Sequence, residues 1–171
     1  MKVVSISKSP FLLKYGCVLS ILSLFLGMKI LMVCLGNICR SPLAHGILNH
    51  LAEEEGLDWT IESAGTGDWH VGQSPDHRSI AVAQKYKVDI SQQKAMHFKP
   101  SLFEIYDHIL VMDHQNYKDV VAQASSKEEK EKVSLFLVDD IVPDPYFDER
   151  LFEPVYQMIE TRCKELIQEW R

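Results

Sequence analysis

The sequence predicts an α/β domain: a doubly wound, four-stranded parallel sheet with helices on both faces. Short apolar runs alternate along the chain with stretches whose apolar residues recur every three or four positions, from Met28 to the C-terminus. This alternation is typical of parallel strands joined by crossover helices. No internal repeat or low-complexity segment interrupts it. We therefore expect one domain over residues 28–171, preceded by an N-terminal extension at 1–27.

The first half of this domain contains two predicted strands and two predicted helices. The apolar run at 30–33 is the first strand, and a helix is predicted at 42–55, where Pro42 suits the first turn. The apolar residues of this helix share one face: Leu43, Ile47, Leu48 and Leu51. A second strand at 59–62 leads through a glycine-containing connection to a helix that begins near Pro75.

The second half supplies two further strands and the clearest helix. Strands are predicted at 108–112 and 134–137, with Asp113 as the N-cap of a helix at 116–122 and a solvated helical turn at 126–132. A long final helix follows, whose face toward the sheet combines Phe152, Val155, Tyr156, Ile159, Cys163, Leu166, Ile167 and Trp170. Because parallel strands end at one edge of a sheet, the segments that follow the first and fourth strands should meet there.

Composition and charge narrow the function classes. The chain has 171 residues, of which 46% are hydrophobic and 25% charged, as in one globular domain with a proper core. A formal net charge of -6 argues against a general nucleic-acid binder, so we expect no nucleic-acid partner. Four cysteines are too few for a disulfide scaffold. A reactive thiol must stay reduced, which favours a cytoplasmic location.

The N-terminal 27 residues leave two interpretations open. Lys2, Lys8 and Lys14 precede an apolar run at 17–26, which is the order of charges and apolar residues in an export signal. The run is short for a bilayer span, and no Ala-x-Ala cleavage site follows it. We favour an upstream start or a dispensable extension and expect no stable membrane insertion. A signal or membrane-tethering segment is the alternative.

The segment Cys-Leu-Gly-Asn-Ile-Cys-Arg-Ser-Pro at 34–42 lies between the first predicted strand and the first predicted helix. A helix beginning near Ser41 would direct its unpaired amides and its positive dipole end at a bound anion, and the same field stabilises a thiolate at Cys34. Arg40 adds a planar fork that suits two phosphate oxygens. Gly36 and Asn37 are residue types that readily adopt positive φ. The segment therefore predicts a phosphate-binding cup with a nucleophile.

Other interpretations of this segment are weaker. A structural zinc pair of Cys34 and Cys39 lacks a second pair of ligands at usable spacing, and the seven histidines, which we expect at surface or loop positions, show no metal-ligand spacing. We therefore expect no metal. A nucleotide phosphate loop would need Gly-Lys-Ser/Thr. An inert, buried cysteine at a strand end is a third interpretation. Ser41 could donate a hydrogen bond to the Cys34 sulfur or simply cap the helix.

The segment 34–42 resembles the signature of the low-molecular-weight protein tyrosine phosphatases. The downstream segment Asp-Pro-Tyr-Phe at 144–147 is similar to the general-acid loop of that family, and 63–66, 68–69 and 74–76 resemble its pocket-wall loop. The resemblance extends over about 28–171. It implies the doubly wound fold, phosphotyrosine-containing proteins as substrates, and no cofactor.

The resemblance also implies a role for each site residue. Cys34 would form a phosphocysteine, and Asp144 would act as general acid and then as base. Phosphate would be bound by Arg40 and by the loop amides of Leu35, Gly36, Asn37, Ile38 and Cys39. Asn37 and Ser63 would hold the loop in shape, and Trp69 and Tyr146 would grip the substrate ring, although a loop tryptophan can also serve packing alone.

Some positions carry more specific expectations. Isoleucine at position 38 favours phosphotyrosine, because relatives that act on phosphoarginine tend to have threonine there. Cys39 is either a small apolar filler or a partner that traps oxidised Cys34 as a disulfide. Phe147 stands where the family often has a second tyrosine, which removes one candidate phosphorylation site. Cys163 is expected in the core.

Two rival functions remain. An arsenate reductase on the same scaffold would need relay cysteines, but none lies between Cys39 and Cys163. A phosphate-binding module that does not hydrolyse its ligand would not need Cys34, Arg40 and Asp144 together. The sequence leaves the oligomeric state and the cellular substrates open.

Overall fold

A computed structural model describes residues 27–171. The expectations for the N-terminal extension, apart from Gly27, lie outside these described residues. Within 27–171, no helix combines the length and the apolar character needed to cross a bilayer.

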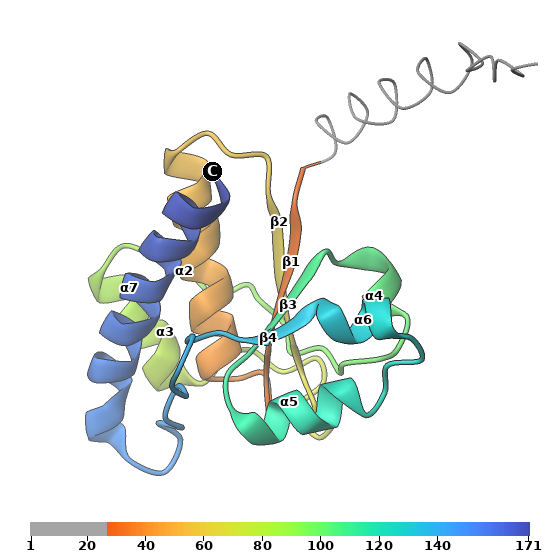
Figure 1. The fold of residues 1–171 in the computed structure, drawn as a ribbon. Coiled ribbons are helices and arrows are strands. Elements are labelled where there is room, and N and C mark those ends of the chain that lie inside the picture. The colour runs from red at the N-terminus through yellow and green to blue at the C-terminus, as the bar shows by residue number, and fades with distance from the viewer. Residues whose placement is uncertain (1–26) are drawn as a thin grey trace, which may run out of the picture.

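The core of the fold is one parallel sheet with strand order β2-β1-β3-β4 (Figure 1). Its strands are β1 (Lys29–Cys34), β2 (Thr60–Gly65), β3 (His108–Val111) and β4 (Val133–Leu135). The chain turns from β1 outward to β2 and then crosses over to β3, so the order reverses between β1 and β3. Open α/β sheets bind ligands at the carboxyl ends of the strands beside such a switch point.

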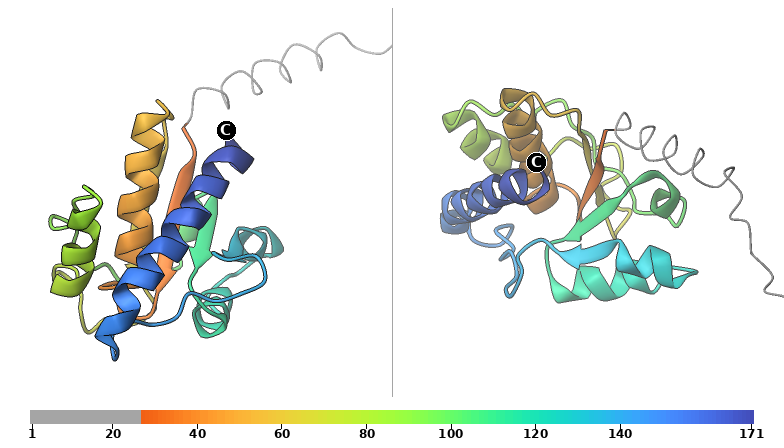
Figure 2. Two further views of the ribbon diagram at one scale, coloured as in Figure 1. Left: turned by 90° about the vertical axis from the view of Figure 1, so that its left-hand side faces the viewer. Right: turned by 45° about the horizontal axis from the view of Figure 1, so that its top comes forward.

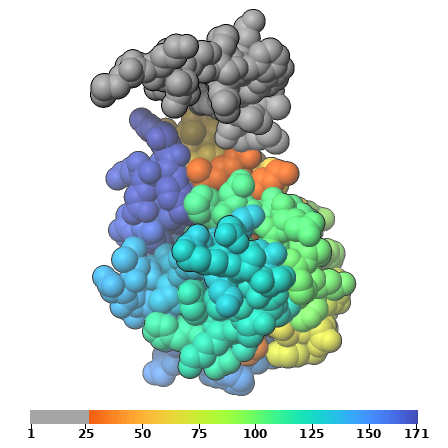
Figure 3. Space-filling view, turned by 45° about the vertical axis from the view of Figure 1, so that its right-hand side comes forward, coloured from red at the N-terminus to blue at the C-terminus, as the bar shows by residue number. Residues whose placement is uncertain are grey.

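Helices cover both faces of the sheet, which confirms the predicted doubly wound arrangement (Figures 1 and 2). One face carries α2 (Arg40–Glu54), α3 (His77–Lys85) and α7 (Phe152–Trp170). The other carries α4 (Leu102–Ile105), α5 (His114–Val121) and α6 (Lys127–Glu131). Figure 3 shows the surface that α5 and α6 form on this second side.

Strand β1 contributes side chains to two clusters of buried apolar residues, one on each face of the sheet. Side chains alternate across a strand, so Ile30 and Met32 pack with α2 and α7, whereas Leu31 and Val33 pack on the opposite side. All four are fully buried. Burial on both faces is the reason that this strand reads as a continuous apolar run.

Element boundaries differ from the prediction in places that bear on the site. Helix α2 begins at Arg40, two residues before the predicted start, and β2 continues to Gly65 rather than stopping at Glu62. The extension of β2 has a clear cause, because Gly65 pairs with Cys34 at the end of β1. Strand β4 ends at Leu135, and helix α4 and a short 3₁₀ helix at Glu149–Leu151 were not predicted.

The expectation that the histidines occupy surface or loop positions is wrong for two of them. His45 lies partly buried on α2, and burial lowers its pKa to about 4. His108 belongs to β3, and its ring stacks on Trp170 with centroids 4.3 Å apart. Both side chains therefore contribute to packing between elements.

Candidate active site

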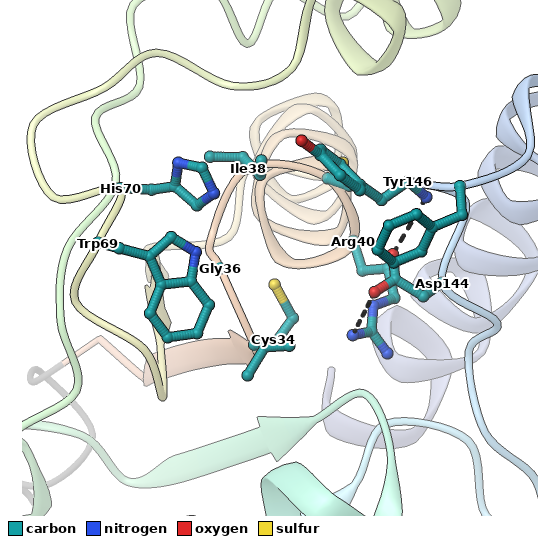
Figure 4. Close-up of a pocket in the computed structure, with 11 residues that line it drawn as sticks. Cys34, Gly36, Ile38, Arg40, Trp69, His70, Asp144 and Tyr146 are labelled. Carbon is teal, nitrogen blue, oxygen red and sulfur yellow. Dashed lines mark hydrogen bonds and ion pairs between the residues drawn. The ribbon is translucent and has the colours of Figure 1, made fainter.

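A pocket of about 350 Å³ opens at the carboxyl end of β1 (Figure 4). The sulfur of Cys34 lies at its base, with Trp69 and His70 on one side and Arg40 and Asp144 on the other. The complete lining is Cys34, Leu35, Gly36, Ile38, Cys39, Arg40, Trp69, His70, Asp144, Tyr146 and Phe147.

The loop between β1 and α2 turns its carbonyl groups away from this pocket. Backbone amides outside the loop bind three of them: Thr66 N donates to Cys34 O at 2.9 Å, Gly67 N to Leu35 O at 2.8 Å, and Asp76 N to Ile38 O at 2.8 Å. Within 27–171, the amides of Gly36, Ile38 and Cys39 have no hydrogen-bond acceptor. The loop is thus a ring of free donors at the N-terminus of α2, which suits an anion.

Asn37 fixes the shape of the loop. It is the loop residue with positive φ, at 53°, and its side-chain amide donates to Ser41 Oγ and Ser63 Oγ, both at 2.9 Å. Its carbonyl oxygen accepts a hydrogen bond from Met96 N at 2.8 Å. The contact between Asn37 and Ser63 that the resemblance implied is present, and both side chains are buried behind the pocket.

The prediction of positive φ at Gly36 is wrong, because only Asn37 takes up the left-handed conformation in this loop. Gly36 is close to the opposite wall of the pocket. A Cβ there would lie 3.1 Å from the His70 ring, so a side chain would crowd the wall of the pocket.

The Cys34 sulfur accepts two hydrogen bonds. Asn37 N donates at 3.2 Å and Ser41 Oγ at 3.0 Å, and the residue is only 3% exposed. Ser41 is not the helix cap: the N-cap position is Cys39, which makes no side-chain capping bond. Of the two roles considered for Ser41, the structure therefore shows the hydrogen bond to the Cys34 sulfur and not the helix cap.

Arg40 is buried, with 4% exposure, between two carboxylates. Its Nη1 donates to Asp113 Oδ2 at 2.7 Å and to Val142 O at 3.2 Å, and its Nη2 lies 3.3 Å from Asp144 Oδ2. Burial works against the charge, but the Cys34 sulfur and these carboxylates outweigh it and raise the Arg40 pKa. The guanidinium is therefore held as a fixed cation beside the sulfur.

Sequence reasoning missed the role of Asp113, which it assigned only to helix capping. The carboxylate does both: Oδ1 accepts from Asn116 N at 2.8 Å as the cap of α5, while Oδ2 binds Arg40. The available clue was its position just after β3, at the same sheet edge as Cys34.

Asp144 comes from the segment after β4. Val142 N donates to Met112 O at 2.9 Å, which anchors this segment to the end of β3. Asp144 Oδ1 accepts a hydrogen bond from Tyr146 N at 3.2 Å, and its side chain is 37% exposed toward the pocket. The predicted convergence of the segments after the first and fourth strands is thus present.

Aromatic side chains form the upper walls of the pocket. Trp69 is 59% exposed and Tyr146 40% exposed, so neither is the packing residue of a closed core. The exposed Phe147 packs edge-on against Tyr146, with ring centroids 5.0 Å apart. Sequence reasoning did not place His70 and Phe147 in the lining, although each adjoins a residue that it had selected.

Cys39 faces the hydrophobic core as well as the pocket. It is 4% exposed, and burial together with the nearby Asp76 carboxylate raises its pKa to about 12. A protonated, packed thiol agrees with the role of a small apolar filler. Cys163 lies fully buried on α7, as expected. Within 27–171, no group of three His, Cys, Asp or Glu side chains is arranged to hold a metal ion.

Family models and known sequences show which proteins this chain is similar to. Residues 29–171 match a model of the family described as low molecular weight phosphotyrosine protein phosphatase. A putative low molecular weight protein-tyrosine-phosphatase of Synechocystis, slr0328, is 40% identical over 151 residues, covering 82% of this chain and 94% of the relative. The low molecular weight phosphotyrosine protein phosphatase of Sus scrofa is 32% identical over 84% of this chain and 96% of its own.

Solved structures agree with the sequence comparisons. The structure of Wzb from Vibrio vulnificus in complex with benzylphosphonate superposes with a TM-score of 0.75 at 30% identity, covering 83% of this chain and 98% of that one. A low molecular weight phosphotyrosine phosphatase from Vibrio cholerae gives a TM-score of 0.79, also at 30% identity, covering 84% and 97%.

Proposed function

This chain belongs to the low molecular weight phosphotyrosine protein phosphatase family, and we propose that it hydrolyses protein phosphotyrosine through a phosphocysteine, with Asp144 as general acid. One observation carries the mechanism: Arg40 and Asp144, 104 residues apart in sequence, approach within 3.3 Å in the pocket whose base is Cys34. A nucleophile, a fixed cation and an acid are the groups that cleavage of a phosphate monoester requires.

The substrate phosphate binds in the cup. Its oxygens accept hydrogen bonds from the free loop amides, and Arg40 provides a bidentate donor. Asp113 and Val142 hold Nη1 of Arg40, so the two donors for phosphate are Nε and Nη2, and Nη2 becomes free when it releases Asp144. These donors are in place before the reaction, so they stabilise the charge that develops on the transferring group without reorganisation.

In the first step, the Cys34 thiolate attacks phosphorus in line with the tyrosyl oxygen. The S–P bond forms as the P–O bond breaks, and the protonated Asp144 carboxyl donates its proton to the departing oxygen. The dephosphorylated tyrosine leaves with that proton. The enzyme now carries a phosphocysteine and an Asp144 carboxylate.

In the second step, Asp144 accepts a proton from water, and the resulting hydroxide attacks phosphorus. The S–P bond breaks, inorganic phosphate forms, and Cys34 returns to the thiolate. The hydrogen bonds from Asn37 N and Ser41 Oγ stabilise this leaving sulfur. The Asp144 carboxyl is again protonated, so the cycle needs no external acid or base.

The pocket walls favour an aryl phosphate. Trp69 and Tyr146 flank the entrance and can sandwich an aromatic ring. The Vibrio vulnificus relative, solved with benzylphosphonate, binds a ligand of related shape, an aromatic ring one carbon from phosphorus. Ile38 adds an apolar side chain to the lining, which suits a ring better than a charged guanidino group.

We place the enzyme in the cytoplasm, where Cys34 stays reduced.

The test of substrate class compares three peptides that differ only in the phosphorylated residue. We expect the largest kcat/KM for phosphotyrosine, because among the three only this side chain is long enough to reach the aromatic walls and also carries a ring that can stack there, and little turnover of phosphoserine or phosphoarginine. Released phosphate is measured for each. Faster hydrolysis of phosphoarginine than of phosphotyrosine would contradict the assignment of substrate class. A rate of thioredoxin-dependent arsenate reduction above the hydrolysis rates of all three peptides would favour an arsenate reductase instead.

Replacing Asp113 with asparagine tests the fixed cation. Asparagine is also a good N-cap, so Asp113→Asn keeps the start of α5 and removes the charge that holds Arg40. We expect kcat/KM for p-nitrophenyl phosphate to fall about 10- to 100-fold, with the melting temperature changed by a few degrees at most. The control is Asp119→Asn, which replaces a partly exposed carboxylate of α5 that is hydrogen-bonded to Gln115 and should leave kcat/KM unchanged. Equal activities of the two variants would exclude a role for Asp113.

A further inference from the structure

Arg78, near the start of α3, lies outside the catalytic groups but contacts the segment that carries the acid. Its guanidinium carbon is 5.5 Å from the centroid of the Tyr146 ring and 4.6 Å from that of Phe152, the first residue of α7. Distances below about 6 Å are those of cation–π contacts. One side chain of α3 thus bridges a wall of the substrate pocket and the start of α7.

The bridge is rigid because Asp76 holds the guanidinium on two sides. Arg78 Nε donates to Asp76 Oδ1 at 2.9 Å and Nη2 to Oδ2 at 2.8 Å, and Arg78 N also donates to Oδ1 at 2.9 Å. The Asp76 side chain is only 9% exposed. Its own amide donates to Ile38 O, so the pair is anchored to the phosphate-binding loop.

The other end of the bridge leads to the acid. Tyr146 N donates to Asp144 Oδ1, which ties the tyrosine backbone to the carboxyl group. Arg78 contacts the ring of this same tyrosine, so Tyr146 links Arg78 to Asp144. Phosphate-binding loop, Asp76, Arg78, Tyr146 and Asp144 form one continuous series of contacts.

We propose that Arg78 is a positioning residue: it holds Tyr146 and, through it, Asp144 at the distance from the phosphate-binding loop that proton transfer to the leaving group requires. The inference rests on the proposed phosphatase function. It assigns to arginine a task that lysine performs poorly, because the bidentate pair with Asp76 and the stacking on Tyr146 both need a planar cation.

The test compares two aryl phosphates that differ in their need for an acid. Phenyl phosphate has a poor leaving group and depends on protonation, whereas p-nitrophenyl phosphate has a good one. For Arg78→Ala and Arg78→Lys we expect kcat/KM, which reports the step that releases the leaving group, to fall about 5- to 20-fold for phenyl phosphate and about 3-fold or less for p-nitrophenyl phosphate. A general loosening of the fold would lower both equally, so the ratio of the two rates is the decisive readout.

The chain offers a matched control in Arg150. It makes the same pair with the aspartate two residues before it, Asp148, but its side chain is 88% exposed. Arg150→Ala should leave the ratio of rates unchanged. All rates are measured well below the melting temperature of the least stable variant. If Arg78→Ala does not fold, Arg78→Lys provides the comparison, because lysine retains the charge and the aliphatic stem.

A double-mutant cycle with Tyr146→Leu tests the route. If Arg78 acts through Tyr146, replacing Arg78 in the Tyr146→Leu background should leave the ratio of rates unchanged. Two outcomes would overturn the role of Arg78 while the phosphatase function stands. One is that the two substitutions have additive effects on the ratio of rates for the two substrates. The other is that both Arg78 variants give the same ratio as Arg150→Ala. A wild-type protein inactive on both substrates would overturn the phosphatase function itself, and this role with it.

Discussion

Cys34→Ser should lower phosphatase turnover by roughly 10⁴-fold or more while the protein still binds a phosphate analogue. A serine hydroxyl is far less acidic than a thiol, so no comparable anion forms at the base of the cup. The loop amides and Arg40 remain in place, because the contacts that shape the loop come mainly from Asn37 and Ser41. The measurement pairs steady-state hydrolysis of p-nitrophenyl phosphate with calorimetric binding of benzylphosphonate.

Cys163→Ser is the matched control for this variant. Cys163 is buried on α7, its sulfur lies 3.8 Å from the carbonyl oxygen of Ala44, and it does not line the pocket. Its replacement should change stability but leave kcat intact. Substantial turnover by Cys34→Ser would contradict covalent catalysis by this sulfur. Loss of benzylphosphonate binding with intact folding would show that the cup itself depends on the thiol.

Asp144→Ala should reduce kcat/KM for phenyl phosphate by about 10²- to 10⁴-fold, with a smaller loss for p-nitrophenyl phosphate. The leaving phenolate receives no proton in the first step, and water loses its base in the second. Stopped-flow absorbance separates the two steps for p-nitrophenyl phosphate: a rapid first release of nitrophenol should be followed by a slow phase that is limited by hydrolysis of the phosphocysteine. A quench in which phosphocysteine is stable shows directly that this intermediate accumulates.

Two further variants sharpen the assignment of the acid. Asp144→Asn retains an oxygen that can accept the hydrogen bond of Tyr146 N, so it isolates proton transfer from loop geometry and should lose nearly as much activity as the alanine variant. Asp140→Asn alters an exposed carboxylate of the same segment and should behave as wild type. Equal losses of kcat/KM for phenyl and p-nitrophenyl phosphate in Asp144→Ala would rule out this residue as the proton donor.

Residues close together in sequence account for what could be predicted about the cup. Its donors, its nucleophile and its cation lie within seven positions between a strand and a helix, so composition and order already limit the backbone to a ring of amides. The apolar pattern likewise indicated a parallel sheet, because a strand buried on both faces and an amphipathic helix have different periods. Boundaries were less certain: β2 reaches Gly65 only because β1 is available to pair with it.

The sequence by itself determined the chemical groups of this protein and the position of the phosphate-binding loop, because the thiol, the arginine and the residues between them lie in one short segment between a strand and a helix. Tertiary structure alone decided what surrounds these groups. Asp113 meets Arg40 across 73 residues because β3 lies beside β1, and Arg78 meets Tyr146 because α3 and α7 share one face of the sheet. Strand order and helix packing arise from the burial of the whole apolar surface, which no local segment encodes.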